Sequence, residues 1–183
     1  MKKIFLTSIF AGLLIVTSCK NDQKEKEVSE KSATPFFYAE VDVEAAQKDD
    51  FALYYTEDNS VNFNGDLAEW SGTKGGNAKE TITFKLREDK FPTNIRLDFG
   101  INKAQDSVKV YQVKIGYQDR SFTIPGAAFF TYFINNEKDF SASIDQKSGA
   151  LKIVKKESTY NTPYFYPTEE LNKKIKEITT GKP

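Results

Sequence analysis

Apolar and polar residues alternate along much of the chain after residue 35, and this period of two predicts β-strands. Residues 36–43, 80–86 and 94–99 show the pattern most clearly. The positions expected to point inward are Phe37, Ala39, Val41 and Val43 in the first stretch, Ile82, Phe84 and Leu86 in the second, and Ile95, Leu97 and Phe99 in the third. Residues 51–56 form a further predicted strand.

The second half of the chain predicts two hairpins. Residues 107–117 alternate throughout, but the apolar phase switches after Val110, which indicates a β-bulge near Tyr111 and Gln112. Residues 121–124 are expected to pair with this strand across a tight turn. The second hairpin joins strands at 140–145 and 150–155 through a four-residue loop that ends in glycine.

Three further segments lack a regular alternation of apolar and polar residues. Residues 57–76 are rich in Asp, Asn, Ser and Gly, and are expected to form a long loop with one short turn or strand near 61–63. Residues 127–133 are apolar all round, so a buried helical turn and a strand both remain open. Residues 160–166 are aromatic and are expected to pack against the sheet.

A short helix is predicted over residues 168–179. Thr168 is a suitable N-cap, and the two glutamates that follow it favour the positive end of a helix. The apolar positions Leu171, Ile175 and Ile178 share one helical face, which should dock on the rest of the domain.

These elements predict a mainly β protein, an antiparallel β-sandwich with a short C-terminal helix. The stretch Pro92-Thr93-Asn94-Ile95-Arg96-Leu97-Asp98-Phe99-Gly100, followed by a long alternating strand, resembles jelly-roll modules of the galactose-binding-like or carbohydrate-binding class. The resemblance spans roughly residues 51–117. It implies a bent sheet with an arginine-containing strand that binds sugars.

The first residues have the layout of a secretory signal: Lys2 and Lys3, an apolar run from Ile4 to Val16, small residues, and then Cys19. The run is too short for a permanent transmembrane helix, which needs about 20 apolar residues. Thr17-Ser18-Cys19 resembles the lipobox of bacterial lipoproteins, which implies lipidation of Cys19 and cleavage before it. An ordinary signal peptide with an accidental cysteine and an uncleaved anchor are the alternatives.

The predicted organisation is therefore a signal peptide at 1–18, a lipidated cysteine with a charged, disordered tether at 19–34, and one domain at 35–183. Residues 20–34 carry many charges and only Val28 as an aliphatic residue, too little apolar surface to fold. We expect a protein anchored by lipid in the cell envelope, in the outer membrane of a Gram-negative bacterium. The membrane leaflet stays open.

Composition excludes several kinds of chemistry. Lysine plus arginine equals aspartate plus glutamate at 26 each, so no basic face for nucleic acid is indicated. Histidine is absent and Cys19, the only cysteine, would carry lipid. These absences leave no imidazole base, thiol nucleophile or Cys/His metal site. We therefore expect no enzymatic activity, no metal and no cofactor.

The predicted loop at 57–76 holds the candidate ligand-binding residues. They are Asp58, Asn59, Asn62 and Asp66, together with the only tryptophan, Trp70. Loop oxygens of this kind suit calcium, although their spacing differs from an EF-hand. An exposed indole beside amides suits stacking on a sugar ring. The alternative is a solvated loop with Trp70 folded into the core.

Asp106-Ser107-Val108 resembles the three-residue acceptor of a bacterial O-glycosylation system, which implies a glycan on Ser107. Ser107 could equally be the plain start of a strand. The acids Glu40, Asp42, Glu80 and Asp98 occupy outward strand positions. A glycosidase needs two carboxyl groups about 5 to 9.5 Å apart, but outward acids usually serve solubility.

Three hypotheses follow. The first is a non-catalytic module that binds a glycan or another envelope component. The second is a scaffold or assembly subunit that binds an envelope protein through a sheet edge or through the C-terminal helix. An exposed apolar patch on that helix would favour the scaffold, whereas an aromatic surface at Trp70 would favour the glycan. The third is a carboxylate-dependent hydrolase.

Overall fold

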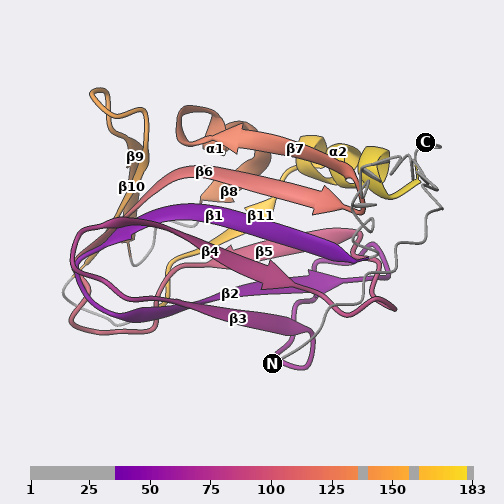
Figure 1. Cartoon of the computed structure of the whole chain (residues 1–183), viewed down its shortest axis with the longest axis horizontal. Coiled ribbons are helices and arrows are strands. Elements are labelled where there is room, and N and C mark those ends of the chain that lie inside the picture. The colour runs from indigo at the N-terminus through magenta and orange to yellow at the C-terminus, as the bar shows by residue number, and fades with distance from the viewer. Residues whose placement is uncertain (1–35, 136–139, 157–160, 181–183) are drawn as a thin grey trace, which may run out of the picture. The chain divides into compact units, whose positions relative to one another are not determined.

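The described part of the chain is a sandwich of two antiparallel sheets (Figure 1). The computed structural model describes residues 36–135, 140–156 and 161–180, all within one compact unit. The strands are β1 (Phe37–Ala45), β2 (Asp49–Thr56), β3 (Ala68–Thr73), β4 (Lys79–Lys85), β5 (Asn94–Asp98), β6 (Ser107–Tyr117), β7 (Arg120–Pro125), β8 (Phe133–Asn135), β9 (Phe140–Ile144), β10 (Leu151–Lys155) and β11 (Tyr164–Pro167). The predicted mainly β sandwich is confirmed.

Sheet A has the order β4-β1-β6-β10-β9, with β7 also paired to β6. Sheet B has the order β3-β2-β5-β11-β8. Strand β6 is long enough for β10 to pair with its first half and β7 with its second half. Between these halves Tyr111 is the extra residue, because Asp42 pairs with Gln112 and Val43 with Val110. The predicted bulge is confirmed.

The core lies between the sheets and consists of the inward positions that the alternation predicts. Each of the ten inward residues of β1, β4, β5 and their ends is at most 3% exposed. Rings of Phe99, Phe129, Phe140 and Phe165 meet at its centre with centroids 5.0–6.4 Å apart. Such rings bury large apolar areas and pack edge to face, so they account for much of the stability.

The hairpin of β9 and β10 is confirmed, and Gly149 adopts a positive φ of 67° in its turn. The turn between β6 and β7 is also confirmed, with Tyr117 paired to Arg120.

The long loop predicted at 57–76 is wrong in part, because residues Ala68–Thr73 form β3 and no strand forms at 61–63. Strand β3 lies at the edge of sheet B and pairs only with β2. Most of its residues are not buried, so its sequence lacks the apolar alternation that marks the other strands. Backbone pairing with β2 therefore holds this strand, and hydrophobic burial does not.

The segment at 127–133 combines both predicted forms. A 3₁₀ turn (Gly126–Ala128) leads into α1 (Phe129–Tyr132), and β8 starts at once. Phe129 and Phe133 stack in the core with centroids 4.6 Å apart, whereas Phe130 is 38% exposed. The aromatic segment at 160–166 is predicted to pack against the sheet. Its last residues belong to β11, which pairs with β5 and β8.

Helix α2 (Glu169–Thr180) follows β11 and confirms the predicted C-terminal helix. Thr168 caps it, since its hydroxyl accepts a hydrogen bond of 3.3 Å from the Leu171 amide. Leu171, Ile175 and Ile178 are at most 8% exposed. Figure 1 shows α2 beside β7, away from the β9–β10 hairpin.

The predictions for the signal peptide, Cys19 and the tether lie outside the described residues. Among the described residues, no helix has the length and apolar character needed to cross a bilayer.

Candidate functional site

The outer face of sheet B carries a continuous group of aromatic side chains. Strand pairing brings Tyr54 opposite Arg96 and Tyr164 opposite Asp98, while Tyr166 lies two residues further along β11. These positions alternate with buried ones, so their side chains leave the sandwich on the solvent side. We call this surface the aromatic face; it consists of Tyr54, Phe63, Trp70, Arg96, Tyr164 and Tyr166.

Arg96 lies at the centre of the aromatic face. Its guanidinium carbon is 4.3 Å from the ring centroid of Tyr54, 5.2 Å from Tyr164, 5.5 Å from Phe63 and 5.8 Å from Tyr166. Each contact is within the range of a cation–π interaction. The guanidinium therefore holds rings from β2, β11 and the loop before β3 in fixed relation to one another.

Asp98 fixes the orientation of Arg96. Two hydrogen bonds of 2.8 Å join Nε and one terminal nitrogen of Arg96 to the two carboxylate oxygens of Asp98. This bidentate geometry is the strong form of an arginine–carboxylate pair. The two side chains are 16% and 10% exposed, so water screens the pair only slightly.

Burial acts on both charges of this pair. It raises the pKa of Asp98 above its ordinary value, and the nearby Arg96 offsets the rise only in part. Burial lowers the pKa of Arg96, but hydrogen bonding to Asp98 and the charge of Asp98 outweigh it, so this pKa is raised. Arg96 stays a cation, and Asp98 is the member that titrates as pH falls.

Trp70 is the most accessible member of the aromatic face, at 53% exposed. It projects from β3, and its ring lies edge-to-face with Tyr54 at a centroid distance of 6.4 Å. The interpretation of Trp70 as a core residue is therefore wrong. At the other side of sheet B, Ile134 pairs with Tyr166 and is also 53% exposed. The exposed apolar surface thus reaches from β3 to β8.

The loop residues predicted beside Trp70 take different places. Asp58 and Asn64 each accept a backbone hydrogen bond from two residues ahead, of 3.0 Å, which is local turn geometry. The backbone N–H of Asn59 donates to the hydroxyl of Thr93, the residue just before β5, at 2.9 Å. Asn62 and Asp66 form local backbone hydrogen bonds, and among the described residues no hydrogen bond or ring contact joins either of them to the indole. In the described ranges no three acidic, cysteine or histidine residues are grouped to hold a metal ion.

The outward acids named as hydrolase candidates each have a partner. Glu40 lies 3.0 Å from the Lys114 ammonium, and Asp42 lies 3.3 Å from that of Lys79. Two more partners are Thr73 for Glu80 and Arg96 for Asp98. The geometry therefore gives Glu40, Asp42 and Asp98 a role in charge pairing, whereas Glu80 accepts hydrogen bonds from a hydroxyl and a backbone amide.

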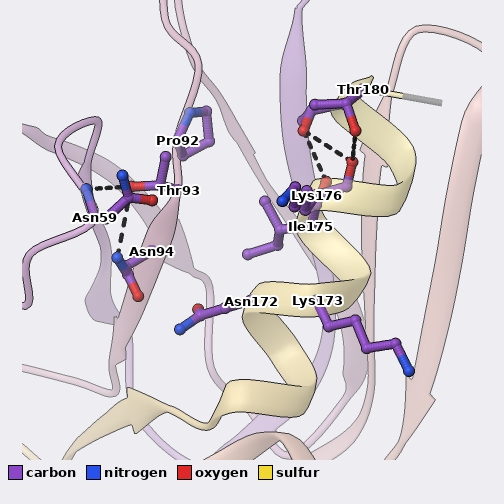
Figure 2. A pocket seen from close by; sticks show the side chains of 10 residues that line it. Asn59, Pro92, Thr93, Asn94, Asn172, Lys173, Ile175, Lys176 and Thr180 are labelled. Atoms are coloured by element: carbon purple, nitrogen blue, oxygen red, sulfur yellow. Dashed lines mark hydrogen bonds between the residues drawn. The ribbon is translucent and has the colours of Figure 1, made fainter.

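A pocket of about 450 Å³ opens between α2 and the start of β5 (Figure 2). Asn59, Thr93 and Asn94 line one side, and Asn172, Ile175 and Lys176 belong to the other. Of these six residues, the sequence pattern indicates only Asn59 as a candidate site residue. The other five come from segments that lie far from Asn59 along the chain.

The sequence also missed most of the aromatic face. Tyr54 and Arg96 occupy outward positions of predicted strands, and this alternation was the available signal. What the alternation does not show is which strands become neighbours. Ser107, the predicted glycan acceptor, is the first residue of β6 and partly exposed, and its modification stays a prediction.

Comparison with known proteins adds no relative: no family model, curated protein or solved structure matches the chain significantly. The geometry of the aromatic face and of the pocket is therefore the basis for inferring what the protein binds.

Proposed function

We propose that this protein is a lipid-anchored envelope protein that binds a glycan, without catalysis, on the aromatic face of sheet B. The observation that carries the proposal is the half-exposed indole of Trp70 beside Tyr54, in a group of rings fixed around Arg96. A pyranose ring has an apolar face of C–H groups and a polar rim of hydroxyls. Indole and phenol rings match this division, because each combines an apolar body with a polar handle.

Preorganisation strengthens the proposal. A surface whose side chains are already fixed loses little conformational entropy when a ligand binds. Arg96 contacts four rings and is itself held by Asp98, so this region does not have to order on binding.

The scaffold hypothesis has less support. An exposed apolar patch on the C-terminal helix would have favoured it, but Leu171, Ile175 and Ile178 pack into the core. The one observation that favours it is the short edge strand β8 with the exposed side chain of Ile134. A hydrolase would need two carboxyl groups facing a cleft. Each of the acids considered above instead forms an ion pair or a hydrogen bond with a neighbouring side chain.

Trp70→Ala tests glycan binding. The probes are β-1,4-linked glucose and xylose hexasaccharides, measured by isothermal titration calorimetry on the full chain purified in detergent. We expect the substitution to weaken the affinity for the better ligand about tenfold, because an aromatic contact contributes about 0.5–1.5 kcal/mol beyond the area that it buries.

Phe91→Ala is the matched control, since Phe91 is 51% exposed but lies against Tyr117, outside the aromatic face. It should leave the affinity unchanged. Absence of binding to either hexasaccharide, or equal losses in both variants, would contradict the proposal.

The lipid anchor has a separate test. Intact-mass analysis of the protein from membranes should give a chain that starts at Cys19 and carries two or three acyl chains. The Cys19→Ser variant should lack this mass and should leave the detergent phase on partitioning. A wild-type chain with a free thiol at Cys19 would refute the anchor and leave the glycan hypothesis untouched.

A further inference from the structure

The pocket between α2 and β5 is a second site, distinct from the aromatic face. Its volume of about 450 Å³ falls within the range of small-ligand sites. Figure 2 shows Asn172 extending from α2 across the gap toward Asn94 and Asn59. One wall is thus a helix, and the other is the segment that enters a central strand, so both walls are fixed by the core.

The lining of this pocket contains polar, basic and apolar residues but no acidic ones. It combines carboxamides, hydroxyls and two lysines with the apolar surfaces of Pro92 and Ile175, and none of the ten lining residues is acidic. Lys173 and Lys176 are both exposed and form no salt bridge with a described residue. By contrast, their neighbour Lys174 pairs with Glu177 at 2.8 Å. The Lys176 ammonium is therefore a positive charge at the pocket that no ion pair with a described residue neutralises.

Asn172 supplies the second feature. Its Oδ1 atom is buried and has no hydrogen-bond partner. A buried acceptor without a partner costs free energy, and a hydroxyl group that enters the pocket would remove this cost. Most other polar groups in the lining are already engaged. The Thr93 hydroxyl bonds with Asn59 and Thr56, and the Thr179 hydroxyl donates to Ile175.

We propose that this pocket binds a single carboxylate-bearing sugar residue, a hexuronate. The sugar carboxylate would lie at the Lys176 ammonium, which belongs to the lining of the pocket. A ring hydroxyl would donate to Oδ1 of Asn172. The C–H groups of the ring would contact the apolar part of the lining, to which Lys176 and Thr179 contribute aliphatic carbons and the buried Pro92 and Ile175 contribute little.

The test uses methyl glucuronoside as the probe and methyl glucoside as its neutral counterpart. Binding to the ¹⁵N-labelled full chain in detergent is followed by NMR, through the amide signals of residues 172–180 and 92–94. We expect saturable shifts with the glucuronoside and at least tenfold weaker binding of the glucoside, because only the former makes a charge-assisted contact. Equal affinities, or shifts with neither sugar, would overturn the proposal.

Lys176→Gln and Lys174→Gln form a matched pair on one helix, with the same change in charge. The first should weaken glucuronoside binding about tenfold, and the second should have no effect. Asn172→Leu should also weaken binding, while its melting temperature stays at or above that of the wild type, because the lost atom had no partner. Equal binding in all three variants would overturn the proposal.

This inference does not depend on the aromatic face. Trp70→Ala should leave glucuronoside binding unchanged, and Lys176→Gln should leave hexasaccharide binding unchanged. Failure of one proposal is therefore distinguishable from failure of the other.

Discussion

Arg96→Met is expected to lower the free energy of unfolding by about 3 kcal/mol, as for removal of one partner from a largely buried ion pair. The substitution leaves the carboxylate of Asp98, whose side chain is 10% exposed, without its counter-charge and without two hydrogen bonds of 2.8 Å. Methionine retains part of the apolar volume of arginine. The measured loss therefore reports mainly the removal of the charge and of the planar guanidinium group. Urea unfolding followed by tryptophan fluorescence would measure the loss.

The loss should depend on pH in a defined direction. Burial already raises the pKa of Asp98 in the wild-type protein, and removal of the cation raises it further. A carboxyl whose folded pKa exceeds its unfolded value contributes stability below the unfolded pKa. That contribution disappears as pH rises through the folded pKa. The difference between Arg96→Met and the wild type should therefore be larger at pH 7 than at pH 3.5.

Arg87→Met serves as the control for this experiment. Arg87 pairs with Asp89 at 3.5 Å, but their side chains are 72% and 67% exposed, so water screens the pair. Its removal should change stability little at either pH. If both variants were equally stable, or if the loss at Arg96 were independent of pH, the structural role of the Arg96–Asp98 pair would be wrong.

Arg96 also shows where prediction from the sequence stops. Alternation around it is strict, and it correctly predicts Ile95 and Leu97 as buried and Arg96 as outward. The same reasoning finds the bulge at Tyr111, because a phase switch is a local signal. The rings that surround Arg96 come from β2, from β11 and from the loop before β3. Their meeting depends on the strand order of sheet B, which no local pattern encodes.

Trp70 illustrates a second limit. Its position on an edge strand depends on backbone pairing with β2, and the polar and small residues around it are typical of a loop. A loop and an exposed edge strand have similar compositions, because neither must bury one face. The prediction that Trp70 belongs to a candidate site could therefore be made from the sequence, but its contact with Tyr54 could not.

The aromatic face must rest on a rigid core, and Phe165 tests this dependence. Phe165 lies between Tyr164 and Tyr166 on β11, with its ring on the opposite side of sheet B and 0% exposed. Its centroid is 5.0 Å from that of Phe129 and 5.3 Å from that of Phe140. Phe165→Ala is expected to lower the free energy of unfolding by about 4 kcal/mol, since it removes a buried ring and leaves a cavity.

The expected loss includes the full cost of a cavity, because the neighbouring rings have little room to collapse into the space. Phe99 is held by β5 and Phe129 by α1, so the cavity would persist. Urea unfolding measures the effect, with Phe130→Ala as the control, because Phe130 is 38% exposed and contributes less.

If Phe165→Ala cost less than about 1 kcal/mol, the cavity would have closed by movement of β11. Such movement would displace Tyr164 and Tyr166 and separate them from Arg96. If β11 is rigid, Phe165→Ala should lower the free energy of unfolding and leave the glycan affinity unchanged. If β11 moves, the variant should keep its stability and bind the glycan more weakly. Measuring both quantities on this one variant decides between a fixed and an adaptable binding surface.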